Sequence, residues 1–251
     1  MNTITVKGVT LGSGSPKIIV PLVGKNEVEL VAEAKHLLTI DCDLVEWRVD
    51  FFNQVQDFQE VAEMSKKIAE ILSDKPLLFT FRTKQEGGEI PFSDEQYFCL
   101  YETVIKSGVI DLLDVELFMD GKLVQRTINL AHEKGIKIVM CNHDFDKTPD
   151  KAEIVSRLCS MQEKNADICK IAVMPQSSDD VLTLLEATNE MKSIHANRPI
   201  VTMSMGQLGM VSRMCGEVFG SAMTFGAAKK ASAPGQVPVE ELREILKTLA
   251  L

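Results

Sequence analysis

Lys170 lies inside the apolar run ADICKIAVM, which spans residues 166–174. The run has the composition of a strand covered on both faces, where a lysine is almost never buried without a partner or a task. Only the neutral amine is a nucleophile, and burial in apolar surroundings favours that form. Such an amine is suited to forming a Schiff base with a carbonyl group. Taken alone, Lys170 is equally consistent with a side chain that reaches solvent from the strand end.

Other polar residues stand near the ends of apolar runs, and their types complement an amine. A histidine supplies a proton shuttle near neutral pH, and residues two apart on a strand share one face. The alternative is that these residues have no role in chemistry: they would form buried ion pairs that fix strand register, or belong to solvated loops or helices. The candidates are Glu46 with Arg48, Arg82 with Glu86, Asp114 with Glu116, His143, the Met203 and Met205 pair, and Arg213.

Eight short apolar runs recur along the chain, separated by segments with the period of amphipathic helices. This alternation of eight strands and helices predicts a (β/α)8 TIM barrel, in which the catalytic residues lie at the carboxyl ends of the strands. An open doubly wound sheet is the alternative, but it would normally show a glycine-rich turn after its first strand. The runs span residues 17–24, 42–51, 76–84, 109–118, 136–145, 166–174, 199–206 and 221–229.

The segments around these runs complete the predicted architecture. TITVKGVTLGSG, before the first barrel strand, alternates like a short N-terminal β-hairpin that closes the bottom of the barrel. Thr148 and Pro149 are expected to cap a helix and occupy its first position, and the last helix is expected near Pro238. No linker interrupts the pattern, so we expect one domain over residues 1–251.

Composition narrows the classes of function. A net charge of −9 argues against nucleic acid and against anionic membrane surfaces. We expect no targeting or membrane-spanning segment, and the scattered cysteines indicate reduced thiols in a cytoplasmic protein. The sequence shows neither an H-E-x-x-H motif nor a cysteine–histidine cluster with zinc spacing, so no metal is expected.

Six motifs, in order along the chain, resemble type I 3-dehydroquinate dehydratase. They are EWRVDFF (46–52), FTFRTKQEGG (79–88), NHDF (142–145), CKIAVM (169–174), MGQLGMVSR (205–213) and ASAPGQ (231–236). The resemblance implies a (β/α)8 barrel, usually a homodimer, that acts in the shikimate route to aromatic amino acids. It also implies dehydration of 3-dehydroquinate to 3-dehydroshikimate without a metal or cofactor.

The resemblance further implies a role for individual residues. Lys170 would form an imine with the ring ketone of the substrate, and His143 would move the protons, oriented by Glu86. Arg213 would clamp the substrate carboxylate, for which a planar guanidinium is suited. The remaining expected substrate contacts are Glu46, Arg48, Arg82, and, in a closing lid KASAPGQVP, Ser232 and Gln236.

Two other functions compete with this one. A class I aldolase uses the same imine on the same barrel but needs a phosphate site. A catalytically dead barrel that serves as a binding module would be free to lose Lys170, His143 and Glu86, all of which are present. Pro21 departs from the family pattern, in which we expect serine at this position of the first barrel strand.

Overall fold

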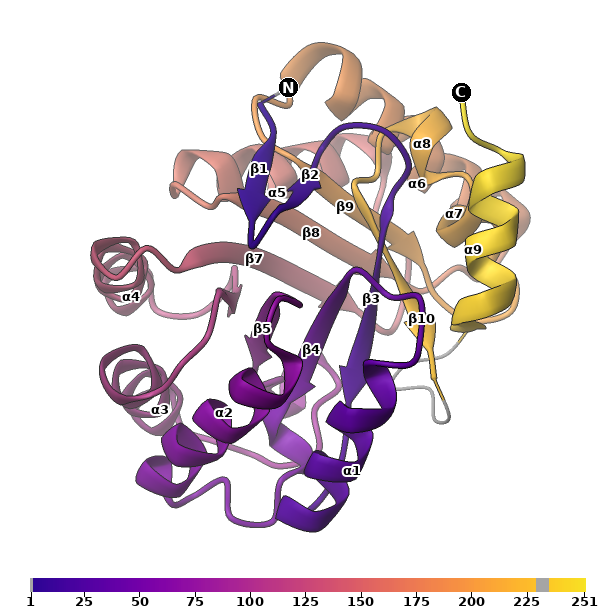
Figure 1. Cartoon of the computed structure of the whole chain (residues 1–251). Coiled ribbons are helices and arrows are strands. Elements are labelled where there is room, and N and C mark those ends of the chain that lie inside the picture. The colour runs from indigo at the N-terminus through magenta and orange to yellow at the C-terminus, as the bar shows by residue number, and fades with distance from the viewer. Residues whose placement is uncertain (1, 229–234) are drawn as a thin grey trace.

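Eight parallel strands, β3 to β10, are arranged around a barrel in the order in which they follow one another along the chain (Figure 1). The computed structural model describes residues 2–228 and 235–251. Strand β10 pairs with β3, and a parallel bridge joins Ile200 of β9 to Ser221, just before β10, which closes the ring. The predicted (β/α)8 barrel is therefore confirmed. The strands are β3 Lys17–Leu22, β4 Leu44–Arg48, β5 Leu77–Thr80, β6 Leu112–Glu116, β7 Lys137–Asp144, β8 Ile168–Val173, β9 Ile200–Ser204 and β10 Met223–Ala227.

Helices surround the sheet and follow most of the strands (Figure 1). The longest, α2, shows why these segments are helical: its apolar residues recur on one face and are buried against the sheet. A two-residue strand, β11 Val237–Pro238, pairs with the outer end of β10. The helices are α1 Glu27–Leu37, α2 Phe58–Leu72, α3 Asp94–Ser107, α4 Gly121–Glu133, α5 Lys151–Glu163, α6 Ser178–Glu190, α7 Val211–Met214, α8 Gly216–Phe219 and α9 Val239–Thr248, with short helical turns η1 Val49–Phe51, η2 Lys84–Glu86 and η3 Met191–His195.

Side chains inside the barrel form an apolar layer below and a polar layer above. Alternate residues of a strand point to the same face, so each inward position is followed by another two residues later. Leu44 is followed by Glu46, Leu112 by Asp114, and Ile168 by Lys170; the first of each pair belongs to a buried apolar cluster inside the barrel. The second residues are polar and buried. The barrel thus places its charged side chains directly above a dry base.

The N-terminal hairpin closes the bottom of the barrel, as predicted. Strands β1 Ile4–Val6 and β2 Val9–Leu11 pair antiparallel, and Leu11 is fully buried in the apolar cluster inside the barrel. At the turn of the hairpin, the Lys7 Nζ lies 2.9 Å from an Asp111 Oδ2. The hairpin is therefore held to the barrel by both packing and an ion pair.

Aspartates before alternate strands pin the lower end of the sheet. Asp43, Asp111 and Asp167 each accept a hydrogen bond from the backbone N–H of a residue in the preceding barrel strand, at 2.7–2.8 Å. The donors belong to Ile18 in β3, Leu77 in β5 and Ile138 in β7. Each carboxylate also contacts a basic side chain, from Arg243, Lys7 and His132 respectively. The same device therefore fixes the pairing of three strand pairs.

Two helix boundaries test the capping predictions. Helix α9 begins after Pro238, as expected. The prediction for Thr148 and Pro149 was wrong: α5 begins at Lys151, and the side chain of Asp150 accepts a hydrogen bond from the backbone N–H of Glu153. An aspartate can satisfy this exposed donor directly, so the helix begins after it and the proline stays outside. In the described part of the chain, no helix is both long and apolar enough to cross a bilayer.

Candidate active site

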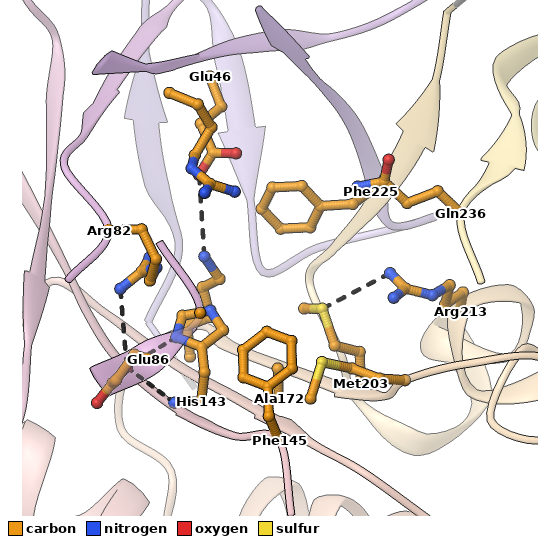
Figure 2. Close-up of a pocket in the computed structure, with 14 residues that line it drawn as sticks. Glu46, Arg82, Glu86, His143, Phe145, Ala172, Met203, Arg213, Phe225 and Gln236 are labelled. Carbon is orange, nitrogen blue, oxygen red and sulfur yellow. Dashed lines mark hydrogen bonds and ion pairs between the residues drawn. The ribbon is translucent and has the colours of Figure 1, made fainter. Parts of the chain in front are cut away.

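A cavity of about 210 Å³ opens at the carboxyl ends of the barrel strands. Of the nine side chains expected in the site, eight line it, and Ser232 lies outside the described residues. Figure 2 shows Glu86 and His143 on one side of the cavity and Arg213 on the other, with Phe225 and Met203 between them. The lining residues are Glu46, Arg48, Arg82, Glu86, Gly87, His143, Phe145, Lys170, Ala172, Met203, Met205, Arg213, Phe225 and Gln236.

Lys170 projects from β8 into this cavity and is almost entirely buried, with 3% of its surface exposed. Its Nζ lies 3.3 Å from an Asp114 Oδ2 and 4.0 Å from a Glu46 Oε1. The Phe225 ring covers the nitrogen, with its centroid 4.8 Å away. The alternative of a lysine that reaches solvent from the strand end is therefore wrong, because the amine is enclosed between carboxylates and an aromatic face.

Arg82 links the carboxylates on one side of the amine. Its Nη2 lies 2.7 Å from Asp114 Oδ1, and its Nη1 lies 2.8 Å from Glu116 Oε1. The same Nη1 donates to the Cys141 Sγ at 3.0 Å. Burial alone would lower the pKa of Arg82, but these neighbours outweigh it and hold the pKa well above its usual value. Arg82 is thus a permanent cation in the wall of the site.

Glu86 fixes the orientation of His143 through one carboxylate oxygen. Glu86 Oε2 accepts from the backbone N–H of His143 and lies 2.9 Å from the His143 Nδ1. Asn142 Nδ2 donates to the other oxygen at 3.1 Å. Burial, with Arg82 and Lys170 nearby, lowers the pKa of His143 well below its usual value. The imidazole is therefore neutral, and its Nε2 is the ring nitrogen left to face the cavity.

The local backbone places Glu86 beside that imidazole. Glu86 ends the turn η2, and Gly87 follows in a left-handed conformation with a φ of 86°. A Cβ at Gly87 would lie 2.5 Å from the Phe145 ring, so glycine allows both the turn and the packing. Burial, with Glu116 close by, raises the pKa of Glu86 to about 8. The carboxyl can therefore exchange a proton near neutral pH.

Arg213 supplies a second cation on the far side of the cavity. It lies in the short helix α7, and its Nη1 is 3.7 Å from the Met203 sulfur. Burial lowers the pKa of Arg213 to about 10, which reflects the cost of removing a guanidinium from water. An anionic ligand in the cavity would offset that cost, so this side of the site is suited to a carboxylate.

Arg48 is held rigidly at the rim by a residue that the sequence analysis missed. Its Nε and Nη2 lie 2.8 Å from the two carboxylate oxygens of Asp50, a bidentate pair. The guanidinium also stacks over the Phe51 ring, 5.0 Å from its centroid. The signal for Asp50 was its position two residues after Arg48 within the motif EWRVDFF. Phe145 and Phe225 were missed because aromatic residues are ordinarily interpreted as packing.

The ligand atoms of Glu86, Cys141 and His143 lie within 4.8 Å of one another, close enough to hold a metal ion. Arg82 Nη1 occupies the same neighbourhood, 3.0 Å from the Cys141 sulfur and 3.7 Å from Glu86 Oε2. Burial also raises the pKa of Cys141 well above its usual value, whereas a metal binds the thiolate. A fixed guanidinium beside a protonated thiol makes these three residues a poor cation site.

Comparisons with known proteins find similarity in sequence and in structure over nearly the whole chain. The family model for type I 3-dehydroquinase matches residues 18–251. The 3-dehydroquinate dehydratase of Enterococcus faecalis is 56% identical over 99% of this chain and 98% of its own length. The enzyme of that name from a Listeria monocytogenes serotype 4b strain is 59% identical over 99% of this chain and 98% of its own length. A crystal structure of type I 3-dehydroquinate dehydratase from Clostridium difficile, with covalently modified comenic acid, superimposes with a TM-score of 0.96 at 52% identity, covering 99% of this chain and 98% of that one.

Proposed function

The chain belongs to the type I 3-dehydroquinase family, and from this premise we propose that it dehydrates 3-dehydroquinate through a Schiff base between the substrate and Lys170. The reaction is the dehydration step of the shikimate pathway, which gives 3-dehydroshikimate. The observation that supports the role of Lys170 most directly is its burial in the cavity, between carboxylates and the Phe225 ring.

The reaction proceeds in balanced steps around that nitrogen. The neutral amine of Lys170 attacks the ring ketone, and loss of one water with uptake of one proton from solvent leaves a protonated imine; the final hydrolysis gives that proton back. His143 Nε2 then takes a proton from the adjacent carbon, and the electron pair moves into the ring to give an enamine. The enamine expels the hydroxyl group on the next carbon, which leaves as water with the proton held by His143. Hydrolysis of the product imine returns the amine. Because the imine accepts the electrons, this chemistry requires no metal or cofactor.

The substrate is a cyclic acid, and the cavity has a distinct group for each end of it. Arg213 binds the carboxylate, because its guanidinium is buried on the side of the cavity away from Glu86 and His143, and an anion there offsets the cost of that burial. Glu46, Arg48 and Arg82 contact ring hydroxyls or balance charge near the amine. Gln236 lines the same cavity from the segment before β11, and Ser232 is proposed to act with it.

Incubation with 3-dehydroquinate tests the proposal directly. The product is a conjugated enone, so absorbance reports turnover, and borohydride converts the protonated imine into a stable secondary amine. We expect mass spectrometry to locate that adduct on Lys170. Turnover without any trapped adduct would contradict the Schiff base, and absence of turnover would favour a dead barrel. The aldolase alternative is not favoured, because relatives that are more than half identical over nearly the full chain are 3-dehydroquinate dehydratases.

The pKa of Glu86 predicts a specific pH dependence. A carboxyl with a pKa of about 8 is protonated below that pH and ionised above it. The ionised form accepts more strongly from Nδ1–H, which leaves Nε2 of His143 free and more basic, so wild-type turnover should rise toward pH 8. Glu86→Gln should lose this rise and be relatively more active under weakly acidic conditions. The hydrogen bond to a charged group contributes roughly 1.5 kcal/mol, so its maximal rate should fall about tenfold.

A pH profile of kcat for both proteins checks this prediction. Glu63→Gln is a suitable control, because Glu63 pairs with Lys66 on the exposed face of α2. An unchanged acid limb in Glu86→Gln would show that Glu86 does not set the protonation of His143.

Gln236→Ala should weaken substrate binding more than it slows the chemistry. Gln236 lines the cavity, but its proposed partner is the substrate, and it contributes no proton or nucleophile. Loss of one hydrogen bond costs roughly 1 kcal/mol, so we expect KM to rise about fivefold to tenfold with kcat nearly unchanged. Steady-state kinetics separate the two constants. A kcat that falls as much as KM rises would instead place Gln236 in the chemical steps.

We also propose a homodimer and a cytoplasmic location, and we retain the prediction of a single domain over residues 1–251. The first two rest on the family resemblance and on the reduced-thiol composition. The six cysteines are free, which is consistent with a reducing compartment. Light scattering during size-exclusion chromatography tests the dimer, and a single cooperative unfolding transition tests the domain.

A further inference from the structure

We propose that Asp114 is the counter-ion of the protonated imine on Lys170 and keeps that imine charged during catalysis. The inference rests on the proposed Schiff base and assigns a function to a residue outside the lining of the cavity. Asp114 is fully buried beneath the site, on β6, which is separated from β8 by one strand, β7. Its Oδ2 lies 3.3 Å from the Lys170 Nζ, closer than the 4.0 Å that separates Nζ from Glu46.

The surroundings of Asp114 hold its carboxylate in one position. Oδ1 receives the Arg82 Nη2 at 2.7 Å and the Cys141 thiol at 3.0 Å, so Oδ2 is turned toward the amine. The backbone carbonyl of Asp114 also accepts from the Tyr101 hydroxyl at 2.7 Å. Glu46, by contrast, shares its nearest oxygen, Oε1, with the Thr80 hydroxyl. Asp114 is therefore the closer and better-oriented carboxylate partner of the Lys170 nitrogen, compared with Glu46.

Asp114 is charged despite its burial. Burial alone would raise its pKa, but Arg82 and Lys170, with the hydrogen bonds from Cys141 and Arg82, lower the pKa below its usual value. The Cys141 thiol can serve as a donor because burial raises its own pKa well above the usual value and keeps it protonated. The pair formed by Asp114 and Cys141 is therefore an anion supported by a neutral donor.

Groups of both signs lie on the strands and turns around the nitrogen, and among the described residues Asp114 alone combines full burial with a contact to it. On the negative side are Glu46 from β4, Asp114 and Glu116 from β6, and Glu86 from η2. On the other side are the cations Arg48 from β4, Arg82 after β5 and Arg213 from α7, with neutral Cys141 and His143 from β7 and the Phe225 ring from β10.

A counter-ion at this place matters because only the protonated imine is a strong electron acceptor. When His143 removes the adjacent proton, the electron pair neutralises the positive charge on the nitrogen and forms the enamine. A neutral imine would have to place a negative charge there instead, so elimination slows in proportion to the fraction of imine that loses its proton. An opposite charge within 4 Å favours the charged form by about one to three pH units.

Asp114→Asn removes the charge but keeps the shape and an acceptor oxygen for Arg82, which retains Glu116 at 2.8 Å. We expect the alkaline limb of the kcat profile to move to lower pH by about one to three units. Formation of the adduct at neutral pH should not be abolished, because Lys170 itself and His143 are untouched. Cyanoborohydride, which reduces protonated imines, should trap the variant's adduct less efficiently as the pH rises, while wild-type trapping stays level.

Glu116→Gln is the matched control, because Glu116 lies on the same strand, is buried and pairs with Arg82, but makes no contact with Lys170 in the described structure. A merely structural role for the buried carboxylates would change both variants alike. We expect the alkaline limb to move in Asp114→Asn and to stay in Glu116→Gln. An alkaline limb of kcat at the same pH in Asp114→Asn and in the wild type would overturn the inference.

Two further arms keep the test decisive. If Asp114→Asn does not fold, the kcat–pH profile of Glu46→Gln is measured instead. An alkaline limb that stays in place supports Asp114 as the counter-ion. An alkaline limb that moves assigns the role to Glu46 and overturns the inference. Trapping in the wild type separates the two proposals. Failure to label Lys170 there contradicts the Schiff base itself, whereas labelling with an unmoved limb in Asp114→Asn contradicts only the counter-ion.

Discussion

Lys170→Met should abolish both the trapped adduct and turnover of 3-dehydroquinate. Methionine has a similar length but no nucleophile, so imine formation is impossible and the electron acceptor is lost. Removal of a covalent nucleophile in other enzymes costs up to about a millionfold, and we expect a loss of at least about 10⁴-fold here. The fold should persist, because Asp114 keeps Arg82 at 2.7 Å after the amine is gone.

Borohydride trapping with mass spectrometry and circular dichroism check these expectations together. Lys137→Met is a matched control, since Lys137 begins the neighbouring strand β7 at the opposite end of the barrel and is partly exposed. That variant should retain the adduct and the activity. Label on Lys229 or Lys230 in the wild type, or residual trapping in Lys170→Met, would contradict the assignment.

His143→Ala should separate formation of the imine from elimination. General acid–base help is worth about 10²–10⁴-fold, and His143 would supply it twice, first as a base and then as an acid. We therefore expect turnover to fall at least about a hundredfold. The adduct should still accumulate, because Lys170 and its neighbours are untouched, although it forms more slowly if the imidazole also assists attack on the ketone.

Rapid mixing followed by borohydride quenching measures the amount of adduct, and enone absorbance measures its consumption. His195→Ala is the control, because His195 lies exposed in η3, remote from the cavity. Near-native turnover in His143→Ala would refute the role of the imidazole. Loss of turnover without an accumulated adduct would show instead that His143 is needed before the imine exists.

Much of the fold could be predicted because its signals are local. Each barrel strand falls within one of the eight apolar runs, and Lys170 stood out because one amine interrupts such a run. Polar residues at the carboxyl ends of strands converge in any parallel barrel, so Glu46, His143 and Arg213 could be placed in one cavity before the structure was known. Their individual roles still rest on the family resemblance and remain predictions.

The contacts between strands were beyond the sequence. Asp114 was recognised as polar and inward, but its place beside Lys170 depends on which side chains meet across the barrel, and spacing along one strand does not encode that distance. Cys141 was expected only to be one of the reduced thiols, because nothing near it in the sequence indicates Arg82 and Asp114 as partners. At α5, Asp150 competed successfully with Thr148 for the cap, a choice decided by one hydrogen bond.

The way the ring closes has a consequence for the nascent chain. Strand β10 pairs with β3, Met223 opposite Lys17, so hydrogen bonds that complete the barrel join opposite ends of the polypeptide. The aspartates at the base repeat this pattern, since Arg243 near the C-terminus contacts Asp43. A chain emerging from the ribosome delivers these partners last, and contacts of such high contact order close slowly. Until they form, the side of the barrel between β9 and β3 is open, and Lys170 lacks the Phe225 ring that covers its nitrogen. The enclosed amine is therefore a property of the finished chain, acquired only when synthesis has passed the last barrel strand.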